Sequence, residues 1–123
     1  MTPAFITGCD VVDVTRFADL IRRRPDVLAR LFTQREHDDV LRDAVSVSTA
    51  VAARRFAARF AAKEAVRKAL RQRGLAFHAI EVRTASDGAP FLFIHGQPSQ
   101  LALSLSHDAG VAFAVVVGSA DAT

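Results

Sequence analysis

The segment from Thr49 to Gln72 restricts the fold of this chain more than any other. It contains no glycine or proline and is rich in Ala, Arg and Leu, which all favour helices. This composition predicts one long helix over Thr49–Gln72. Arg59, Lys63 and Arg67 fall among its bulky apolar side chains, and the opposite arc is mostly alanine. Because a surface helix usually keeps its charges away from its bulky apolar stripe, we expect part of this face to line a polar cleft.

An apolar segment near the start of the chain predicts a strand. Phe5–Val14 is rich in β-branched residues, and Gly8 within it indicates a bulge or the close approach of another backbone. Side chains alternate between the two faces of a strand. Asp10 therefore shares a face with apolar neighbours, and its carboxylate needs a partner or a cation because a bare buried charge is costly.

Shorter helices are expected between this strand and the long helix. A helical period begins at Thr15, is interrupted by Pro25 and resumes as a second short apolar stripe. Thr33-Gln-Arg-Glu36 matches a capping box, which predicts a helix over Gln34–Asp43. The candidate caps of the long helix are Ser46 and Ser48.

The last third of the chain alternates between apolar and polar residues, with turn-forming residues between the runs. The alternation places Leu101, Leu103, Leu105 and His107 on one strand face, and we expect the last strand to be mostly buried. Helices followed by a meander predict an α+β fold, with helices packed on an antiparallel sheet in one small domain over residues 1–123. The expected strands are Ala79–Thr84, Phe91–His95, Leu101–His107 and Val111–Val117, with a loop at Gly96–Ser99.

The composition excludes several classes of protein. Half of the 123 residues are apolar, a quarter are charged and the net charge is +3, which excludes a disordered tail protein. No apolar run approaches about 18 residues, so we expect no membrane partner. The first ten residues lack the features of a signal peptide, which favours a cytoplasmic protein. A single cysteine excludes an internal disulfide and a cysteine cluster for zinc, and we expect Cys9 to be a small buried residue.

Two carboxylates on different elements are candidate metal ligands. Asp10 and Glu64 would make a minimal Mg²⁺ site, which substrate phosphates usually complete. The only lysines are Lys63, which adjoins Glu64, and Lys68, one turn beyond it, and both would neutralise charge on a metal-bound pyrophosphate. Glu64 and Lys68 also have the spacing of an ordinary stabilising helix pair, so both interpretations remain open here.

Two further groups have both structural and functional interpretations. His107 ends a strand, where a lone histidine is commonly structural, and Ser106 and Asp108 lie too close to it in sequence for a hydrolytic triad. The basic run of Arg16 and Arg22–Arg24 is either a solvated face or a docking surface for an acidic protein or nucleic acid. Tyr and Trp are absent and no nucleic-acid motif appears, so we expect no nucleic-acid partner.

The ordered set of motifs resembles the holo-(acyl carrier protein) synthases, which are 4′-phosphopantetheinyl transferases. The resemblance covers about Thr7 to Val117. It is carried by Gly8-x-Asp10-Val-Val-x-Val-x-Arg16-Phe17, Arg59-Phe60-Ala-Ala-Lys63-Glu64-Ala-x-x-Lys68-Ala, Ile80-Glu81-Val82, Gly88-x-Pro90 and Ser104-x-Ser106-His107.

The resemblance implies an activity and a set of site residues. Members transfer the phosphopantetheine of coenzyme A to a serine of an apo acyl carrier protein and release adenosine 3′,5′-bisphosphate. By resemblance, Asp10 and Glu64 hold Mg²⁺, and Glu64 and Lys68 are catalytic, with Glu64 the candidate base directly or through a metal-bound water. The implied coenzyme A contacts are Arg59, Lys63, Lys68, Ser106 and His107. The implied carrier-protein contacts are Arg16, Arg22, Arg23 and Arg24.

The resemblance also implies a homotrimer with active sites between subunits, for which the alanine arc and the last strand would supply packing surfaces. The chain departs from the family after the signature helix, where Arg71-Gln-Arg73 and a single Gly74 replace a glycine-rich turn. This puts the local loop geometry, and any phosphate contact there, in question.

Two other functions remain open at this point. A non-catalytic basic module would bind an acidic partner without Mg²⁺ or coenzyme A, and a Mg²⁺-dependent hydrolase would cleave a pyrophosphate without a carrier protein. The sequence also leaves open whether the carrier protein serves fatty acid or polyketide synthesis.

Overall fold

The first and last strands of the chain pair with each other. The computed structural model describes residues 2–43, 46–47 and 49–121. Strand β1 (Phe5–Asp13) lies antiparallel to β6 (Val111–Ser119), which also pairs with β5 (Ala102–Asp108). The β1–β6 register runs without interruption past Gly8, which pairs with Val116, so the predicted bulge is absent from this strand.

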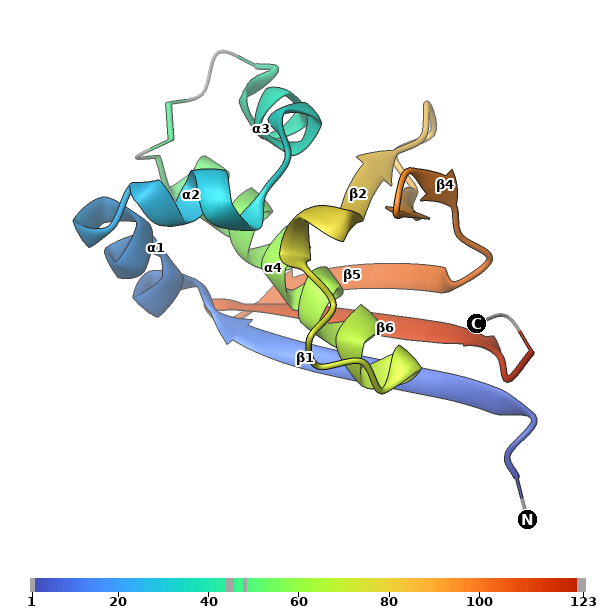
Figure 1. Ribbon diagram of the computed structural model, residues 1–123. Coiled ribbons are helices and arrows are strands. Elements are labelled where there is room, and N and C mark those ends of the chain that lie inside the picture. Colours follow the sequence, from blue (N-terminus) through green and yellow to red (C-terminus); the bar gives the residue numbers. More distant parts are fainter. Residues whose placement is uncertain (1, 44–45, 48, 122–123) are drawn as a thin grey trace.

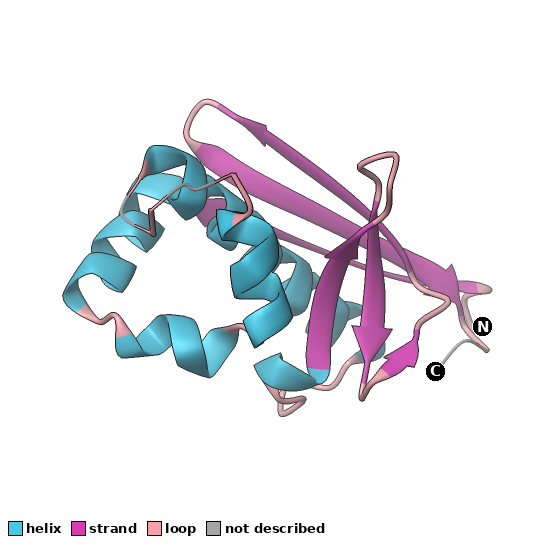
Figure 2. Cartoon of the chain, turned by 90° about the horizontal axis from the view of Figure 1, so that it is seen from above, coloured by secondary structure: helices cyan, strands magenta, loops and turns pink. Residues whose placement is uncertain are grey.

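A second small sheet contains β2 (Ile80–Thr84), β3 (Pro90–Ile94) and the two-residue strand β4 (Gln97–Pro98), in the order β2-β3-β4. The predicted hairpin is confirmed, and the predicted loop at Gly96–Ser99 contains β4. The prediction of a single meander is wrong, because β5 pairs with β6 and not with the preceding strands. The α+β class is confirmed, with the helices gathered beside the strands (Figure 2).

Three short helices follow β1, each near its predicted place: α1 (Val14–Arg23), α2 (Asp26–Leu31) and α3 (Gln34–Leu41). The Asp13 carboxylate caps α1 by accepting from the Arg16 backbone N–H at 3.0 Å. The predicted capping box of α3 is confirmed, since Thr33 and Glu36 each accept from the other's backbone N–H.

The long helix α4 (Ala50–Leu70) begins one residue and ends two residues inside its predicted bounds. Thr49 is its cap and accepts from the Ala52 N–H at 3.1 Å, in place of the predicted Ser46; the other candidate, Ser48, lies outside the described residues. Arg71 ends the helix in the left-handed conformation, with φ 55°. Glycine adopts this conformation more easily than arginine does.

Helix α4 packs across β1 and β6, as Figure 1 shows. Its alanine arc faces this sheet, and Ala61, Ala62 and Ala65 are fully buried within one chain. The expectation that this arc packs between subunits is therefore wrong. The predicted close approach at Gly8 is confirmed, because a Cβ there would lie 2.2 Å from the Ala65 carbonyl oxygen.

The other face of the β1-β6-β5 sheet is uncovered in a single chain. Strand β6 buries only alternate residues, so the expectation of a mostly buried strand holds for one face alone. Cys9 is exposed on the uncovered face, which corrects its predicted burial. The large apolar side chains exposed on this sheet are Phe5, Val11, Phe113 and Val117. Among the described helices, none combines the length and apolar character needed to span a bilayer.

Substituting Gly8 with alanine should destabilise the protein. The new Cβ would lie 2.2 Å from the Ala65 oxygen and 2.7 Å from the Ala69 nitrogen, so the backbones of β1 and α4 must separate. We expect a loss of about 3 kcal/mol in the free energy of unfolding, the upper end of the usual range for an overpacked site. Urea denaturation measures it.

Gly74→Ala is the matched control, because a Cβ at that position meets no atom within 4 Å and its φ is not positive. We expect a change within about 0.5 kcal/mol, as for surface substitutions in general. Equal stability of the two variants would contradict the role assigned to Gly8.

Candidate active site

Asp10 lies two residues beyond Gly8, on the face of β1 that α4 covers. Its side chain is 18% exposed, and its Oδ1 accepts a hydrogen bond from Lys68 Nζ at 3.2 Å. The same ammonium donates to the Cys9 carbonyl oxygen at 3.0 Å. The carboxylate thus has the cationic partner that its position on an apolar face requires.

Glu64 lies one helical turn before Lys68, on the same side of α4. Its side chain is 30% exposed, and its Oε1 accepts from Arg67 Nη1 at 3.3 Å. An open cavity of about 890 Å³ adjoins these side chains and is lined by Glu64, Arg67, Lys68, Arg71 and Arg73. Four cations and one carboxylate make this cavity strongly attractive to an anion.

The two carboxylates suit a magnesium ion that a substrate also binds. No described residue donates a hydrogen bond to Asp10 Oδ2 or Glu64 Oε2, and in the described part of the chain they are not joined by a third His, Cys, Asp or Glu. Mg²⁺ prefers oxygen ligands, keeps several waters and is commonly completed by phosphates. The donor set therefore fits Mg²⁺ accompanied by a phosphate ligand.

Lys63 lies on another side of α4 and is fully buried. Its Nζ donates to Glu36 Oε1 at 2.7 Å, to the Phe77 carbonyl oxygen at 2.9 Å and to the Ile80 carbonyl oxygen. Burial lowers the pKa of Lys63, and the Glu36 carboxylate opposes this shift. All three ammonium hydrogens therefore have acceptors inside the protein.

Arg59, Ser106 and His107 line a separate cavity of about 250 Å³ between α4 and β5. Arg59 is buried, with Nη1 donating to the Arg55 carbonyl oxygen at 3.2 Å, and its Nε has no partner among the described residues. Burial lowers the pKa of Arg59. Nine positions separate Arg59 from Lys68, about 14 Å along the helix axis, so one chain does not bring the two groups together.

Comparison with known proteins identifies the fold and its family. The sequence profile of the 4′-phosphopantetheinyl transferase superfamily matches residues 6–117. The chain belongs to this superfamily. A holo-(acyl carrier protein) synthase of Frankia alni is 42% identical over 119 residues, covering 89% of this chain and 92% of the relative. Another from Geobacter metallireducens is 40% identical over 123 residues, covering 92% and 95%.

A solved structure of a superfamily member has the same fold. The holo-(acyl carrier protein) synthase of Bacillus anthracis, in complex with CoA (3′,5′-ADP), matches with a TM-score of 0.75 at 27% identity, covering 91% of this chain and 93% of that one. The family resemblance and the transferase-like α+β fold predicted from the sequence are both confirmed.

The structure assigns Lys63 a different place from the one its resemblance to the superfamily implied. We expected it beside the coenzyme's phosphates, but its ammonium is enclosed by Glu36 and two carbonyl groups. The charges among the bulky residues of α4 likewise line a cleft only in part. Lys63 is fully buried, Arg59 is buried beside the small cavity near β5, and Arg67 borders the large cavity.

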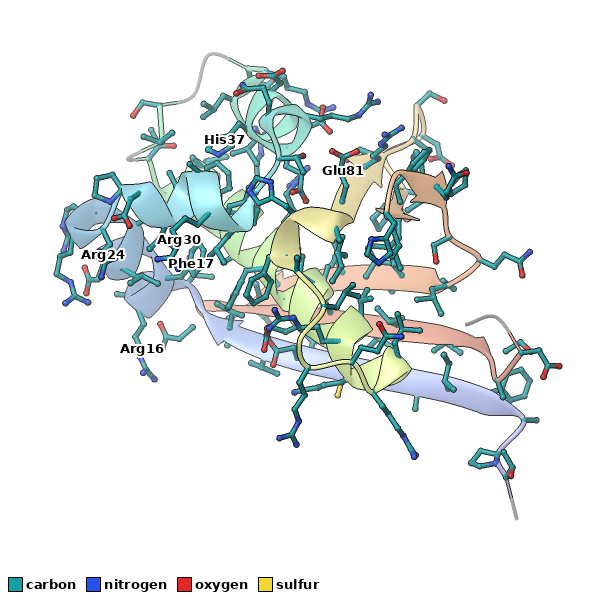
Figure 3. All side chains as sticks on the ribbon, viewed as in Figure 1. Arg16, Phe17, Arg24, Arg30, His37 and Glu81 are labelled. Carbon is teal, nitrogen blue, oxygen red and sulfur yellow. The ribbon has the colours of Figure 1, made fainter. Side chains whose placement is uncertain are left out.

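The predicted carrier-binding arginines divide into two pairs. Arg16 and Arg23 line a hollow of about 430 Å³ that Asp10 also lines, and Figure 3 shows Arg16 pointing away from the helices. Arg22 and Arg24 instead form exposed ion pairs with Asp19 and Asp26. The hollow shares Asp10 with the candidate metal site and is also lined by Asp13 and Asp19, so Arg16 and Arg23 lie beside carboxylates.

Sequence reasoning missed two contributions to this superfamily site. It did not assign a role to Glu36 beyond the capping box, although a lysine within a bulky apolar stripe signals a buried partner. It also treated Arg71 and Arg73 only as a departure from a glycine-rich turn, whereas both line the large cavity. Their contact with the cavity depends on the left-handed turn at Arg71, which no local pattern indicated.

Replacing Lys63 with methionine should destabilise the fold. The change leaves the Glu36 carboxylate buried without its cation, which typically costs about 3–5 kcal/mol. The double variant Glu36→Gln with Lys63→Met should lose less than the sum of the two single variants in urea denaturation, because the buried charge is gone. A stable Lys63→Met protein with a raised KM for coenzyme A would instead place this ammonium at the coenzyme.

Proposed function

We propose that this chain is a holo-(acyl carrier protein) synthase, which transfers 4′-phosphopantetheine from coenzyme A to a serine of an apo acyl carrier protein. The observation that carries the proposal is the contact of Asp10 with Lys68, one turn from Glu64, beside a cavity lined by four cations. Curated relatives about 40% identical are holo-(acyl carrier protein) synthases, and the Bacillus anthracis structure is in complex with CoA (3′,5′-ADP).

The site supplies the charges that phosphoryl transfer requires. The serine oxygen of the carrier protein attacks the phosphorus that bears the pantetheine, and the bond to the second phosphate breaks to release adenosine 3′,5′-bisphosphate. Lys68, Arg71 and Arg73 stabilise the negative charge on the phosphoryl oxygens. Glu64 accepts the serine proton, directly or through a water. Asp10 and Glu64 would hold Mg²⁺, which supplies further charge neutralisation at the pyrophosphate.

The hollow lined by Arg16 and Arg23 is the proposed docking place for the carrier protein. Charged residues steer the approach of an oppositely charged partner, and an acidic carrier surface on these arginines would bring its serine close to Asp10. Because Arg22 and Arg24 already have acidic partners, we assign them a smaller contribution.

We also propose that the chain works as a homotrimer with the site between subunits. Two observations support this. Arg59 lies about 14 Å along α4 from Lys68, and Ser106 and His107 line the same small cavity as Arg59, so this group would serve the site of a neighbouring chain. The uncovered sheet face also exposes large apolar side chains, which mark interaction surfaces when they are contiguous. The cytoplasmic location and the role in fatty acid biosynthesis stay predictions.

Glu64→Gln should abolish transfer while the fold persists. Intact-mass spectrometry of an apo acyl carrier protein incubated with enzyme, coenzyme A and Mg²⁺ should show a gain of one phosphopantetheine with the wild-type protein. The gain should disappear with chelator and with Glu64→Gln, because a neutral amide binds Mg²⁺ poorly and accepts no proton. Glu81→Gln, on β2, is the matched control and should remain active. Full activity of Glu64→Gln would remove Glu64 from the mechanism.

Phe113→Asp should dissociate the proposed trimer. Phe113 is 37% exposed on the uncovered sheet face, and a buried unpaired carboxylate there would disfavour association. Phe91 on β3 is 38% exposed and provides the control Phe91→Asp, which should remain trimeric. Sedimentation velocity measures both masses. A monomeric wild-type protein at micromolar concentration would contradict the trimer.

A further inference from the structure

We propose that Arg67 is a positioning residue that holds Glu64 ready for the metal, an inference that rests on the proposed function. Arg67 makes three contacts at once. Its Nη1 donates to Glu64 Oε1 at 3.3 Å, its Nε donates to the Leu75 carbonyl oxygen at 2.8 Å, and its guanidinium lies 3.6 Å from the centroid of the Phe77 ring. A planar guanidinium can make these contacts together, whereas a lysine ammonium cannot.

The segment that anchors Arg67 is itself fixed to α4. Lys63, one turn earlier on the helix, donates to the carbonyl oxygens of Phe77 and Ile80. Two cations spaced four residues apart on α4 therefore hold the chain between Leu75 and Ile80 from one side. Arg67 is thus packed between the helix and a restrained segment, and its side chain is only 21% exposed.

The geometry leaves one oxygen of Glu64 available. Arg67 occupies Oε1, and no described residue donates to Oε2. A free glutamate loses up to about 2 kcal/mol of rotamer entropy when it is fixed, so a carboxylate already held in place binds a metal more tightly. Partners of metal ligands typically change metal affinity or activity by about 10–100-fold when they are removed.

The direction in which Arg67→Gln changes the metal affinity distinguishes a positioning role of Arg67 from a purely electrostatic one. Removing a nearby cation would by itself strengthen the binding of a dication. If Arg67 acted only through its charge, Arg67→Gln would therefore bind metal more tightly. If Arg67 positions Glu64, the same variant binds metal more weakly.

The experiment uses Mn²⁺ as the probe. Electron paramagnetic resonance of free Mn²⁺ gives the dissociation constant for the metal alone, without coenzyme A, and Mg²⁺ titration of phosphopantetheine transfer gives the concentration for half-maximal rate. We expect Arg67→Gln to raise both by at least about tenfold, with the KM for the carrier protein unchanged. Circular dichroism melting shows whether each variant is folded.

Arg83→Gln is the matched control. Arg83 pairs with Glu81 at 2.7 Å and lies 3.4 Å from the centroid of the Phe93 ring, so on β2 it repeats the carboxylate and ring contacts of Arg67. We expect it to lose similar stability without a change in Mn²⁺ affinity. The variant Phe77→Leu removes the ring that packs on Arg67 and leaves every charge in place. It should also weaken Mn²⁺ binding. If Arg67→Gln does not fold, Phe77→Leu alone tests the proposal.

Three results would overturn the role of Arg67. The first is a Mn²⁺ affinity of Arg67→Gln that is less than tenfold below that of the wild type, and the second is an equal loss of Mn²⁺ affinity in Arg83→Gln. The third, which applies if Arg67→Gln does not fold, is an unchanged Mn²⁺ affinity in Phe77→Leu. Absence of transfer by the wild-type protein would instead overturn the proposed function. The two failures are distinguishable because the first occurs with wild-type transfer intact.

Discussion

The contact between β1 and α4 at Gly8 is the constraint on which the site depends. A Cβ at this position would overlap the helix backbone, so only glycine lets the strand and helix meet so closely. Asp10 comes two residues later on the same strand face and meets Lys68 in the last turn of the helix. The alanines of α4 serve the same purpose, since larger side chains would hold the helix away from the sheet. The close packing of β1 on α4 therefore also brings Asp10 and Lys68 into contact.

The buried pair of Lys63 and Glu36 connects this arrangement to the rest of the chain. Glu36 accepts from Thr33 and Val82 backbone groups as well as from Lys63. One carboxylate thereby joins the start of α3, strand β2 and the middle of α4, none of which are neighbours in sequence. A buried ion pair is weak evidence for stability in general, because desolvation opposes the attraction. Its value here is geometric, because the pair specifies which helix turn faces the second sheet.

Local sequence patterns predicted the helices and strands well, but they did not predict which elements pair or pack together. Helix caps, the hairpin and the alternation of β5 depend on residues close in sequence, and the structure agrees with most of them. The pairing of β1 with β6 joins opposite ends of the chain, and periodicity contains no information about such partners. The same limit explains the wrong predictions for Lys63, Cys9 and the alanine arc. The sequence pattern identified the face on which each lies, but tertiary packing determines whether another element covers that face. Asp10, Glu64 and Lys68 were selected together because a family motif contains them, and the structure places Asp10 in contact with Lys68.

The left-handed Arg71 has a consequence for motion. For a residue other than glycine, the left-handed conformation is less favourable than the right-handed one by roughly 1–2 kcal/mol. The backbone N–H groups of Arg71 and Gln72 end the helix by donating to the carbonyl oxygens of Lys68 and Arg67. The end of α4 at Arg71 therefore opens more easily than the buried middle of the helix. Amide hydrogens there should exchange with solvent faster than those around the buried Lys63. The part of the large cavity's wall that Arg71 forms is thus better able to rearrange than the buried middle of the helix.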